Sequence, residues 1–158
     1  MLKEEANISF IYPSLHEDVA AAVSHEIGST WFHQDGNESS CDNEYSTFVT
    51  GNFECNSYAC SKSGWSSGKV TIHIMGFPGN GYTAVVFNQR CKSCRQLGIF
   101  TLNEQSYVDR VTYRLKKWAG VSSERRIYFR KETPPHRRDL CEGCKRGVCE
   151  ETKLRMYR

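Results

Sequence analysis

The most informative stretch of the sequence is VTIHIMGFPGNGYTAVVFNQRCKSC, residues 70–94. Apolar and other side chains alternate along 70–75, and this period of two predicts a half-buried β-strand. The turn sequence GFPGNG follows, and the β-branched and aromatic residues of 82–87 predict the returning strand. We therefore expect a β-hairpin that leads into a closely spaced pair of cysteines.

Most of the cysteines lie in short-spaced groups. Seven of the eight form the patterns Cys55-x4-Cys60, Cys91-x2-Cys94 and Cys141-x2-Cys144-x4-Cys149. Two cysteines separated by two residues can direct both sulfurs to one point, as a tetrahedral zinc site requires. The opening MLKEEANISF lacks the apolar core of a secretory signal, so we expect the thiols to stay reduced and to bind metal. Because the first two groups flank the hairpin, they predict a zinc-ribbon-like unit.

A histidine is expected to complete the ligand set. HRRDLCEGCKRGVC, residues 136–149, offers one imidazole and three thiolates. We predict two Zn²⁺ ions, each held by four protein ligands. The first set is Cys55, Cys60, Cys91 and Cys94, and the second is His136, Cys141, Cys144 and Cys149. Spacing alone also permits an interleaved arrangement, in which one pair is exchanged between the sites.

The remaining histidines and Cys41 are assigned no metal. Cys41 stands alone in a polar, acidic stretch and is expected to be a free thiol. The other histidines fall on a predicted helix, loop or strand, where packing or surface roles are the simpler interpretation; they are His16, His25, His33 and His73.

The sequence predicts no enzyme. Zinc with four protein ligands has no position for water, which is typical of structural rather than catalytic sites. If His136 is not a ligand, the second site keeps three sulfurs and can admit water, so that alternative stays open. GxSxG occurs at Gly64–Gly68, but it makes a nucleophile only on a strand-to-helix turn, and we interpret it here as a plain turn. Pairing of Cys41 with His33 is rejected because an acidic loop raises the pKa of a thiol and weakens it as a nucleophile.

Composition and charge limit the classes of protein to which the sequence can belong. The 158 residues suffice for one domain with an apolar core. Residues 1–60 carry one cation and ten acids, whereas 61–118 carry nine cations and two acids and 119–158 carry eleven and six. Such asymmetry is typical of a nucleic-acid or acidic-partner surface, although the halves can also neutralise each other on folding. No run approaches the ~20 apolar residues of a membrane span, and we expect a cytoplasmic protein, with the nucleus as the alternative.

Two helices complete the expected elements. Residues 14–27 combine a capping-box pair, Ser14 and Glu17, with apolar residues every four positions. Residues 104–118 show a similar apolar face after the capping residue Asn103. A mobile loop is expected over 33–46 and a short strand over 127–129.

These elements predict an α+β fold: a small zinc-stabilised antiparallel sheet with zinc-ribbon-like hairpins and about two flanking helices. We divide the chain into an N-terminal helix and acidic loop (1–47) that pack on a zinc-binding domain (48–149), followed by a charged tail (150–158).

Read together, the cysteine segments resemble the 3CxxC-type zinc-finger family. The matching segments run from Phe53 to Cys60, from Trp65 to Val70, from Asn88 to Cys94, from Tyr107 to Val111 and from His136 to Cys149. The family includes the animal receptor-transporting proteins and small fungal proteins, and the last segment is most similar to the fungal members. The first pair departs from the family pattern, with x4 in place of x2 spacing.

The resemblance implies a zinc-binding fold and, in the animal members, a role in bringing chemosensory receptors to the cell surface. Those members carry a C-terminal hydrophobic anchor, whereas this sequence ends in ETKLRMYR. We expect a non-catalytic interaction domain that binds a protein partner, with a membrane-protein client as the partner that the resemblance implies.

The alternative function is nucleic-acid binding, with RNA as the ligand. Basic residues lie near the cysteine groups in sequence, and aromatic residues among them could stack on bases. The cations are Lys62, Lys69, Arg90, Lys92, Arg95, Arg125, Arg126, Arg137, Arg138, Lys145 and Arg146, and the aromatic residues are Tyr58, Trp65, Tyr82 and Phe87.

Overall fold

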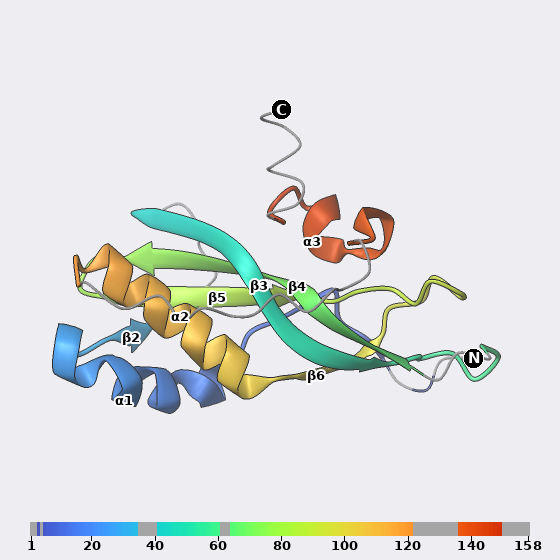
Figure 1. The fold of residues 1–158 in the computed structure, drawn as a ribbon, viewed down its shortest axis with the longest axis horizontal. Helices are drawn as coiled ribbons and strands as arrows, with labels where there is room; N and C mark the ends of the chain where they lie inside the picture. Colours follow the sequence, from blue (N-terminus) through green and yellow to red (C-terminus); the bar gives the residue numbers. More distant parts are fainter. Residues whose placement is uncertain (1–2, 4, 35–40, 61–63, 122–135, 150–158) are drawn as a thin grey trace.

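The computed structural model describes residues 3, 5–34, 41–60, 64–121 and 136–149. The strands are β1 (Ser9–Phe10), β2 (Trp31–Phe32), β3 (Asn43–Glu54), β4 (Gly64–Phe77), β5 (Gly81–Phe87) and β6 (Ile99–Leu102). The helices are α1 (His16–Ile27), α2 (Glu104–Trp118) and α3 (Glu142–Lys145), with 3-10 turns at Pro13–Leu15 and Arg138–Leu140. Figure 1 shows α1 and α2 side by side, with α3 well away from both.

One six-stranded sheet organises these elements. Its order is β1-β5-β4-β3-β6, with antiparallel neighbours throughout, and β2 pairs in parallel with the start of β5. The predicted hairpin is present as β4 and β5, and residues 78–80, in the middle of the sequence GFPGNG, make its turn. β3 and β4 extend past the hairpin, and their far ends lead into the loop that carries Cys55 and Cys60.

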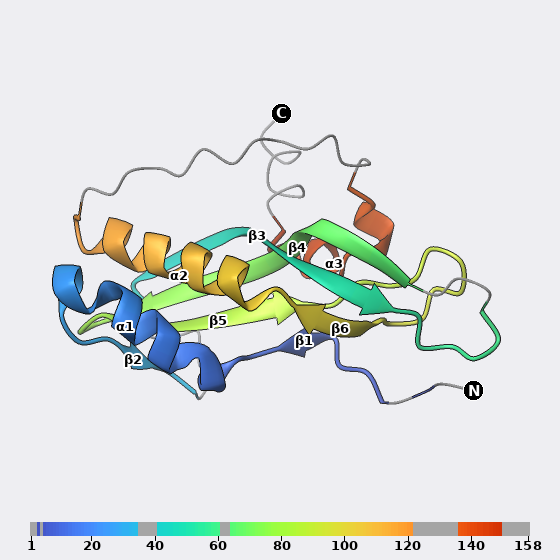
Figure 2. The same cartoon turned by 60° about the horizontal axis from the view of Figure 1, so that its bottom comes forward.

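The sheet curls until its two outer strands meet. β1 and β6 stand at opposite ends of the strand order, yet the rings of Phe10 and Phe100 are 5.7 Å apart (Figure 2). The buried side chain of Asn88 joins the two edges, because its Nδ2 donates to the carbonyls of Asn7 at 2.8 Å and Gly98 at 2.9 Å. An amide with two N–H groups is suited to this position because it satisfies both carbonyls inside the protein.

The apolar core lies between one face of the sheet and the two long helices. Alternation along β4 sends Val70, Ile72 and Ile74 to this face, as a strand's period of two requires. Helices α1 and α2 cover the face with apolar stripes, and Lys116 of α2 pairs with Glu26 of α1 at 2.7 Å. The remaining core residues are Leu15, Val19, Val49, Phe53, Tyr82, Ala84, Val86, Tyr107, Val111 and Leu115.

The opposite face of the sheet buries polar side chains. Thr71 and His73 of β4 point away from the apolar core and are buried. His73 Nδ1 lies 2.9 Å from Ser46 Oγ across the β3–β4 pair and hydrogen bonds with it. This cross-strand pair belongs to a strand that begins at Asn43, so the predicted loop over 33–46 is wrong for its last four residues. The strand was not recognised in the sequence because its buried side chain, Ser46, is polar, as is the partner of Ser46, His73.

Both long helices are confirmed. The first begins as a 3-10 turn at Pro13 and continues as α1, and the second begins where Asn103 Oδ1 accepts a hydrogen bond from Ser106 N at 3.1 Å. The predicted strand at 127–129 and the charged tail at 150–158 lie outside the described residues. The division of the chain at residue 47 stays a prediction. Among the helices of the described segments, none has the length and apolar character of a membrane span.

Candidate metal centres

The first cluster brings together the four cysteines that flank the hairpin: Cys55, Cys60, Cys91 and Cys94. Their sulfur atoms all lie within 4.8 Å of one another. The Cys55 and Cys94 sulfurs are 3.5 Å apart, and those of Cys60 and Cys91 are 3.8 Å apart. Sulfurs at about 2.3 Å from a tetrahedral zinc ion are separated by about 3.8 Å, so the cluster has the dimensions of a zinc site with four cysteine ligands.

Two tight loops position these sulfurs. Cys55 directly follows β3, and Cys60 N donates to Ser57 O at 3.3 Å, which closes the first loop. In the second loop Cys91 N donates to Gln96 O at 2.9 Å and Arg95 N donates to Cys91 O at 2.8 Å. Arg95 takes a φ of 63°, the left-handed conformation that turns the chain back. Both pairs therefore face inward at the end of the β3–β4 extension.

The second cluster comprises His136, Cys141, Cys144 and Cys149. The ligand atoms lie within 4.8 Å of one another. His136 Nε2 is 3.4 Å from the Cys144 sulfur and 3.6 Å from the Cys149 sulfur. A nitrogen and a sulfur on one tetrahedral zinc ion are separated by about 3.6 Å, so this cluster fits a zinc site with three cysteine ligands and one histidine ligand.

A compact turn folds the second cluster. α3 places Cys144 one turn after Cys141, and Gly147 adopts a φ of 75° after the helix. The N–H groups of Val148 and Cys149 then donate to Gly143 O at 3.1 and 3.2 Å. Glycine is suited to position 147 because a left-handed φ costs it little. The reversal carries the third sulfur back to the first two.

Side chains of the sheet surround the second cluster. Thr71 Oγ1 of β4 lies 3.4 Å from the Cys141 sulfur, and the rings of Phe48 and His136 are 6.0 Å apart. A hydroxyl that donates to a metal-bound thiolate and a ring that fixes an imidazole are typical surroundings of a metal site. The second cluster is therefore built on the polar face of the sheet.

In the metal-free protein, the clusters hold ionisable groups in unusual states. Burial, together with the neighbouring thiols, raises the pKa of Cys55 to about 12. Burial also opposes ionisation of Cys91, but the amides of Ser93 and Cys94 and the nearby thiols outweigh it and lower its pKa to about 7. Burial lowers the pKa of His136, but hydrogen bonds to Cys144 and Cys149 raise it to about 9. Cys91, with a lowered pKa, thus lies beside Cys55, with a raised pKa, and a bound dication would stabilise the thiolate form of both.

Zinc affinity is expected to rise with pH between about 6.5 and 8.5. In this range the Cys55 thiol and the His136 imidazole of the metal-free protein are protonated, and both must lose a proton to bind zinc. Each proton released increases the apparent affinity by about tenfold per pH unit below the metal-free pKa. Competition with a chelator, corrected for the chelator's own protonation, measures this slope. An affinity that stays constant over the range would contradict the assignment.

Gly143→Ala is expected to destabilise the protein by about 2 kcal/mol, because overpacking at a crowded site typically costs about 1–3 kcal/mol. A Cβ at this position would lie 2.5 Å from Thr71 Oγ1 and 2.6 Å from Thr71 Cβ, both on the central strand β4. Urea unfolding of the zinc-loaded chain measures the effect. Gly68→Ala is the matched control, because the nearest atom to its Cβ is Thr50 Cγ2 at 4.0 Å. Equal stability of the two variants would show that the second cluster does not pack on β4 as described.

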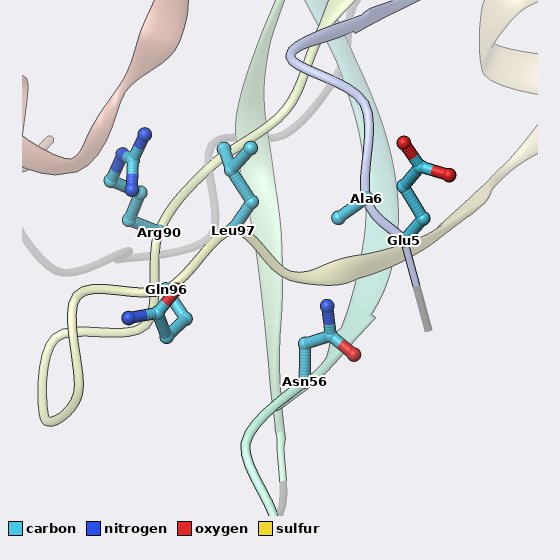
Figure 3. A pocket seen from close by; sticks show the side chains of 6 residues that line it. All are labelled: Glu5, Ala6, Asn56, Arg90, Gln96 and Leu97. Atoms are coloured by element: carbon cyan, nitrogen blue, oxygen red, sulfur yellow. The ribbon is translucent and has the colours of Figure 1, made fainter. Parts of the chain in front are cut away.

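A cavity of about 280 Å³ adjoins the first cluster (Figure 3). It is lined by Glu5, Ala6, Asn56, Arg90, Gln96 and Leu97. Asn56 follows Cys55 and Arg90 precedes Cys91 in sequence, and Lys3 N donates to Asn56 O at 2.7 Å. The N-terminal segment therefore contacts the loop of the first cluster directly.

Comparison with known families agrees with this geometry. A family model of the 3CxxC zinc-ribbon type, described as a zinc-binding domain, matches residues 48–147. The chain therefore belongs to the 3CxxC zinc-ribbon family of zinc-binding domains. The match ends two residues before Cys149, which the fold nevertheless places in the second cluster. No curated protein and no solved structure matches the chain.

The structure groups the candidate ligands as the spacing paired them, without the interleaved exchange. Each cluster could hold one zinc ion, which agrees with the family. That all eight residues coordinate zinc stays a prediction. Cys41 belongs to neither cluster, and neither do the other histidines: His16 and His73 hydrogen bond with Tyr82 and Ser46, and His33 packs on Phe77.

The interpretation of the GxSxG motif as a plain turn is wrong. Gly64–Gly68 lies within β4, where Ser66 Oγ donates to Asn52 Oδ1 of β3 at 2.7 Å. Gly64 serves close packing instead, since a Cβ at this position would collide with the carbonyl oxygen of Phe53. A serine in the middle of an antiparallel strand does not have the strand-to-helix turn of a nucleophile elbow.

Sequence reasoning missed the residues that support the ligands. Thr71 carried a weak signal, as a hydroxyl residue within an apolar strand, but nothing in the sequence related it to Cys141, 70 positions away. Glu142 looked like an ordinary surface acid, yet it is buried and pairs with Arg90.

Proposed function

We propose that this protein is a non-catalytic, zinc-stabilised interaction domain that binds a protein partner. The observation that supports it most is the donor count of the clusters. Each cluster offers four protein ligand atoms at tetrahedral separations, so a bound zinc ion would have no position for water or substrate. Such an ion contributes folding free energy, and the function then depends on the surface that it stabilises.

Exposed apolar side chains favour a protein partner. Ile8 and Ile11 flank β1 and retain 49% and 46% of their accessible surface. Tyr58, in the loop of the first cluster, is 68% exposed. These side chains are candidates for contact with a protein partner, and tyrosine in particular is enriched in protein interfaces.

The same structure weakens the case for nucleic-acid binding. Tyr82 and Phe87 are buried, so they offer no ring for base stacking. Trp65 is half-buried and stacks on Phe53 with ring centroids 4.9 Å apart. Four of the candidate cations are ion-paired, Arg90 and Lys145 with Glu142 and Arg95 and Arg137 with Asp139, so two carboxylates offset half of this positive charge. Lys62, Arg125 and Arg126 lie outside the described residues.

A cytoplasmic location and a membrane-protein client belong to the same proposal. Clusters of reduced thiols are stable in a reducing compartment, which supports the location. Family resemblance alone supports the client, and the test below does not depend on it.

The zinc-loaded full chain, immobilised on beads, tests the proposal. We expect it to retain a defined protein from a cell extract at about 0.5 M salt. The double variant Ile8→Ser/Ile11→Ser should bind that protein at least about tenfold more weakly, as truncation of interface hot spots does. Ala21→Ser/Ala22→Ser, on the exposed side of α1, is the control and should bind normally. Retention of RNA that falls steeply with salt would favour the nucleic-acid alternative instead. Equal binding by both variants would contradict the proposed surface.

A further inference from the structure

The two clusters are joined by a partly buried ion pair. Arg90 immediately precedes Cys91 of the first cluster, and Glu142 immediately follows Cys141 of the second. Arg90 Nε donates to Glu142 Oε1 at 2.7 Å. The Glu142 side chain is only 7% exposed and that of Arg90 is 29% exposed, so water screens this pair less than a surface pair.

Main-chain hydrogen bonds run beside the ion pair. Arg90 N donates to Leu140 O at 2.9 Å, and Glu142 N donates to Asn88 O at 3.2 Å. Between them, Gln89 and Cys141 form an antiparallel bridge. The segment that leads into Cys91 is therefore hydrogen-bonded to the segment that carries Cys141.

Arg90 also fixes the turn between Cys91 and Cys94. Its Nη1 donates to Arg95 O at 2.9 Å, just past the second of these cysteines. Arg95 in turn donates through Nη1 to Asp139 Oδ2 at 2.7 Å. One guanidinium thus contacts both the loop of the first cluster and the helix of the second.

We propose that the two metal sites fill cooperatively, and that the Arg90–Glu142 pair couples them. The proposal rests on the eight cluster residues being zinc ligands. Zinc in the second cluster fixes Cys141 and with it Glu142, which holds Arg90 and the Cys91–Cys94 turn in ligand geometry. The free-energy cost of ordering the first site is therefore smaller when zinc already occupies the second site. By thermodynamic linkage, zinc in the first site also raises the zinc affinity of the second.

Zinc titration of the metal-free full chain, followed by native mass spectrometry, tests the coupling. Two independent, equal sites leave about half of the molecules with one zinc ion at half saturation. Couplings are typically about 5–150-fold, and a fivefold coupling of equal sites already lowers the one-zinc species to about a third. We therefore expect the one-zinc species of the wild type to stay below about a third. In Glu142→Gln we expect that species to rise towards the independent value.

Matched variants separate this coupling from general effects. Glu26→Gln makes the same chemical change in the Lys116 pair, where Nζ and Oε2 are 2.7 Å apart, and should behave as the wild type. Asp139→Asn weakens the exposed contacts of Asp139 with Arg95 and Arg137, leaves the Arg90–Glu142 pair in place and should raise the one-zinc species by a smaller amount. This variant keeps the test valid if Glu142→Gln folds poorly.

Two results would overturn the proposal: a wild type with about half its molecules in the one-zinc form at half saturation, or unchanged all-or-none filling in both Glu142→Gln and Asp139→Asn. The final stoichiometry reports separately on the ligand set, because a chain that never binds two zinc ions contradicts the ligands rather than their coupling.

Discussion

Cys91→Ser and Cys144→Ser are each expected to unfold most of the domain. Each substitution removes one of four ligand atoms and leaves a weak hydroxyl donor in a site shaped for zinc. Structural zinc supplies roughly 10–16 kcal/mol of binding free energy, whereas whole domains are stable by only about 5–15 kcal/mol. The loss of even part of the metal affinity is therefore enough to unfold the chain. Far-ultraviolet circular dichroism and urea unfolding of the purified variants measure the effect.

Cys41→Ser is the control for these substitutions. Cys41 is half-buried and belongs to neither cluster, so the same thiol-to-hydroxyl change there should leave zinc binding intact and alter stability by less than about 1 kcal/mol. Equal tolerance of serine at positions 41, 91 and 144 would show that zinc does not hold the fold together.

Asn88→Ala is expected to cost about 3 kcal/mol of unfolding free energy, because each buried group left without a partner costs about 1–3 kcal/mol. The Asn88 side chain donates to Asn7 O and Gly98 O, and its Oδ1 accepts from Gln89 N at 2.8 Å. Alanine would leave two carbonyls and one N–H group unsatisfied where the sheet curls onto its own edge. We also expect faster hydrogen exchange at β1, because β1 loses one of the contacts that hold it beside β6.

Asn52→Ala provides the comparison for Asn88→Ala. Asn52 accepts a hydrogen bond from Ser66 Oγ at 2.7 Å, but it is exposed on β3, so water replaces the lost partner. A loss of less than about 1 kcal/mol is expected there. If both variants lose the same stability, the side chain of Asn88 does not close the sheet.

Local patterns in the sequence were sufficient to predict both long helices and the central hairpin. The helices at 14–27 and 104–118 follow from apolar residues at helical spacing, and both are confirmed. The Asn103 cap is present, but the capping box of Ser14 and Glu17 is wrong, because Ser14 lies inside the 3-10 turn and no side chain caps α1. The hairpin follows from alternation around GFPGNG. The cysteine spacing predicted the pairs within each cluster, because the chain fixes the geometry of short-range pairs locally. Spacing alone left open which pairs share a site, and the fold resolves this without an exchange.

Features that depend on distant partners could not be predicted. β1 and β2 are two residues long, so they carry no periodicity, and they exist only because β5 offers its edge. The acidic start of β3 looked like a loop because its buried side chain, Ser46, is polar and its partner is His73, 27 residues away.

The ion pair between the two clusters could not be predicted from the sequence either. Arg90 and Glu142 are separated by 52 positions, and each looked like an ordinary charged residue beside a cysteine. Arg90 was considered as a phosphate-binding cation, whereas in the fold its charge is used internally. Sequence reasoning places charges near a site, but only tertiary structure decides whether they face solvent or one another.

The zinc content of the full chain, measured by native mass spectrometry, tests the central claim most directly. We predict a mass that corresponds to two bound zinc ions in the wild type and in Cys41→Ser, with zinc weakened or lost from the second cluster in His136→Ala. A wild-type chain that carries one zinc ion or none, or full retention of both ions without His136, would contradict two closed four-ligand sites.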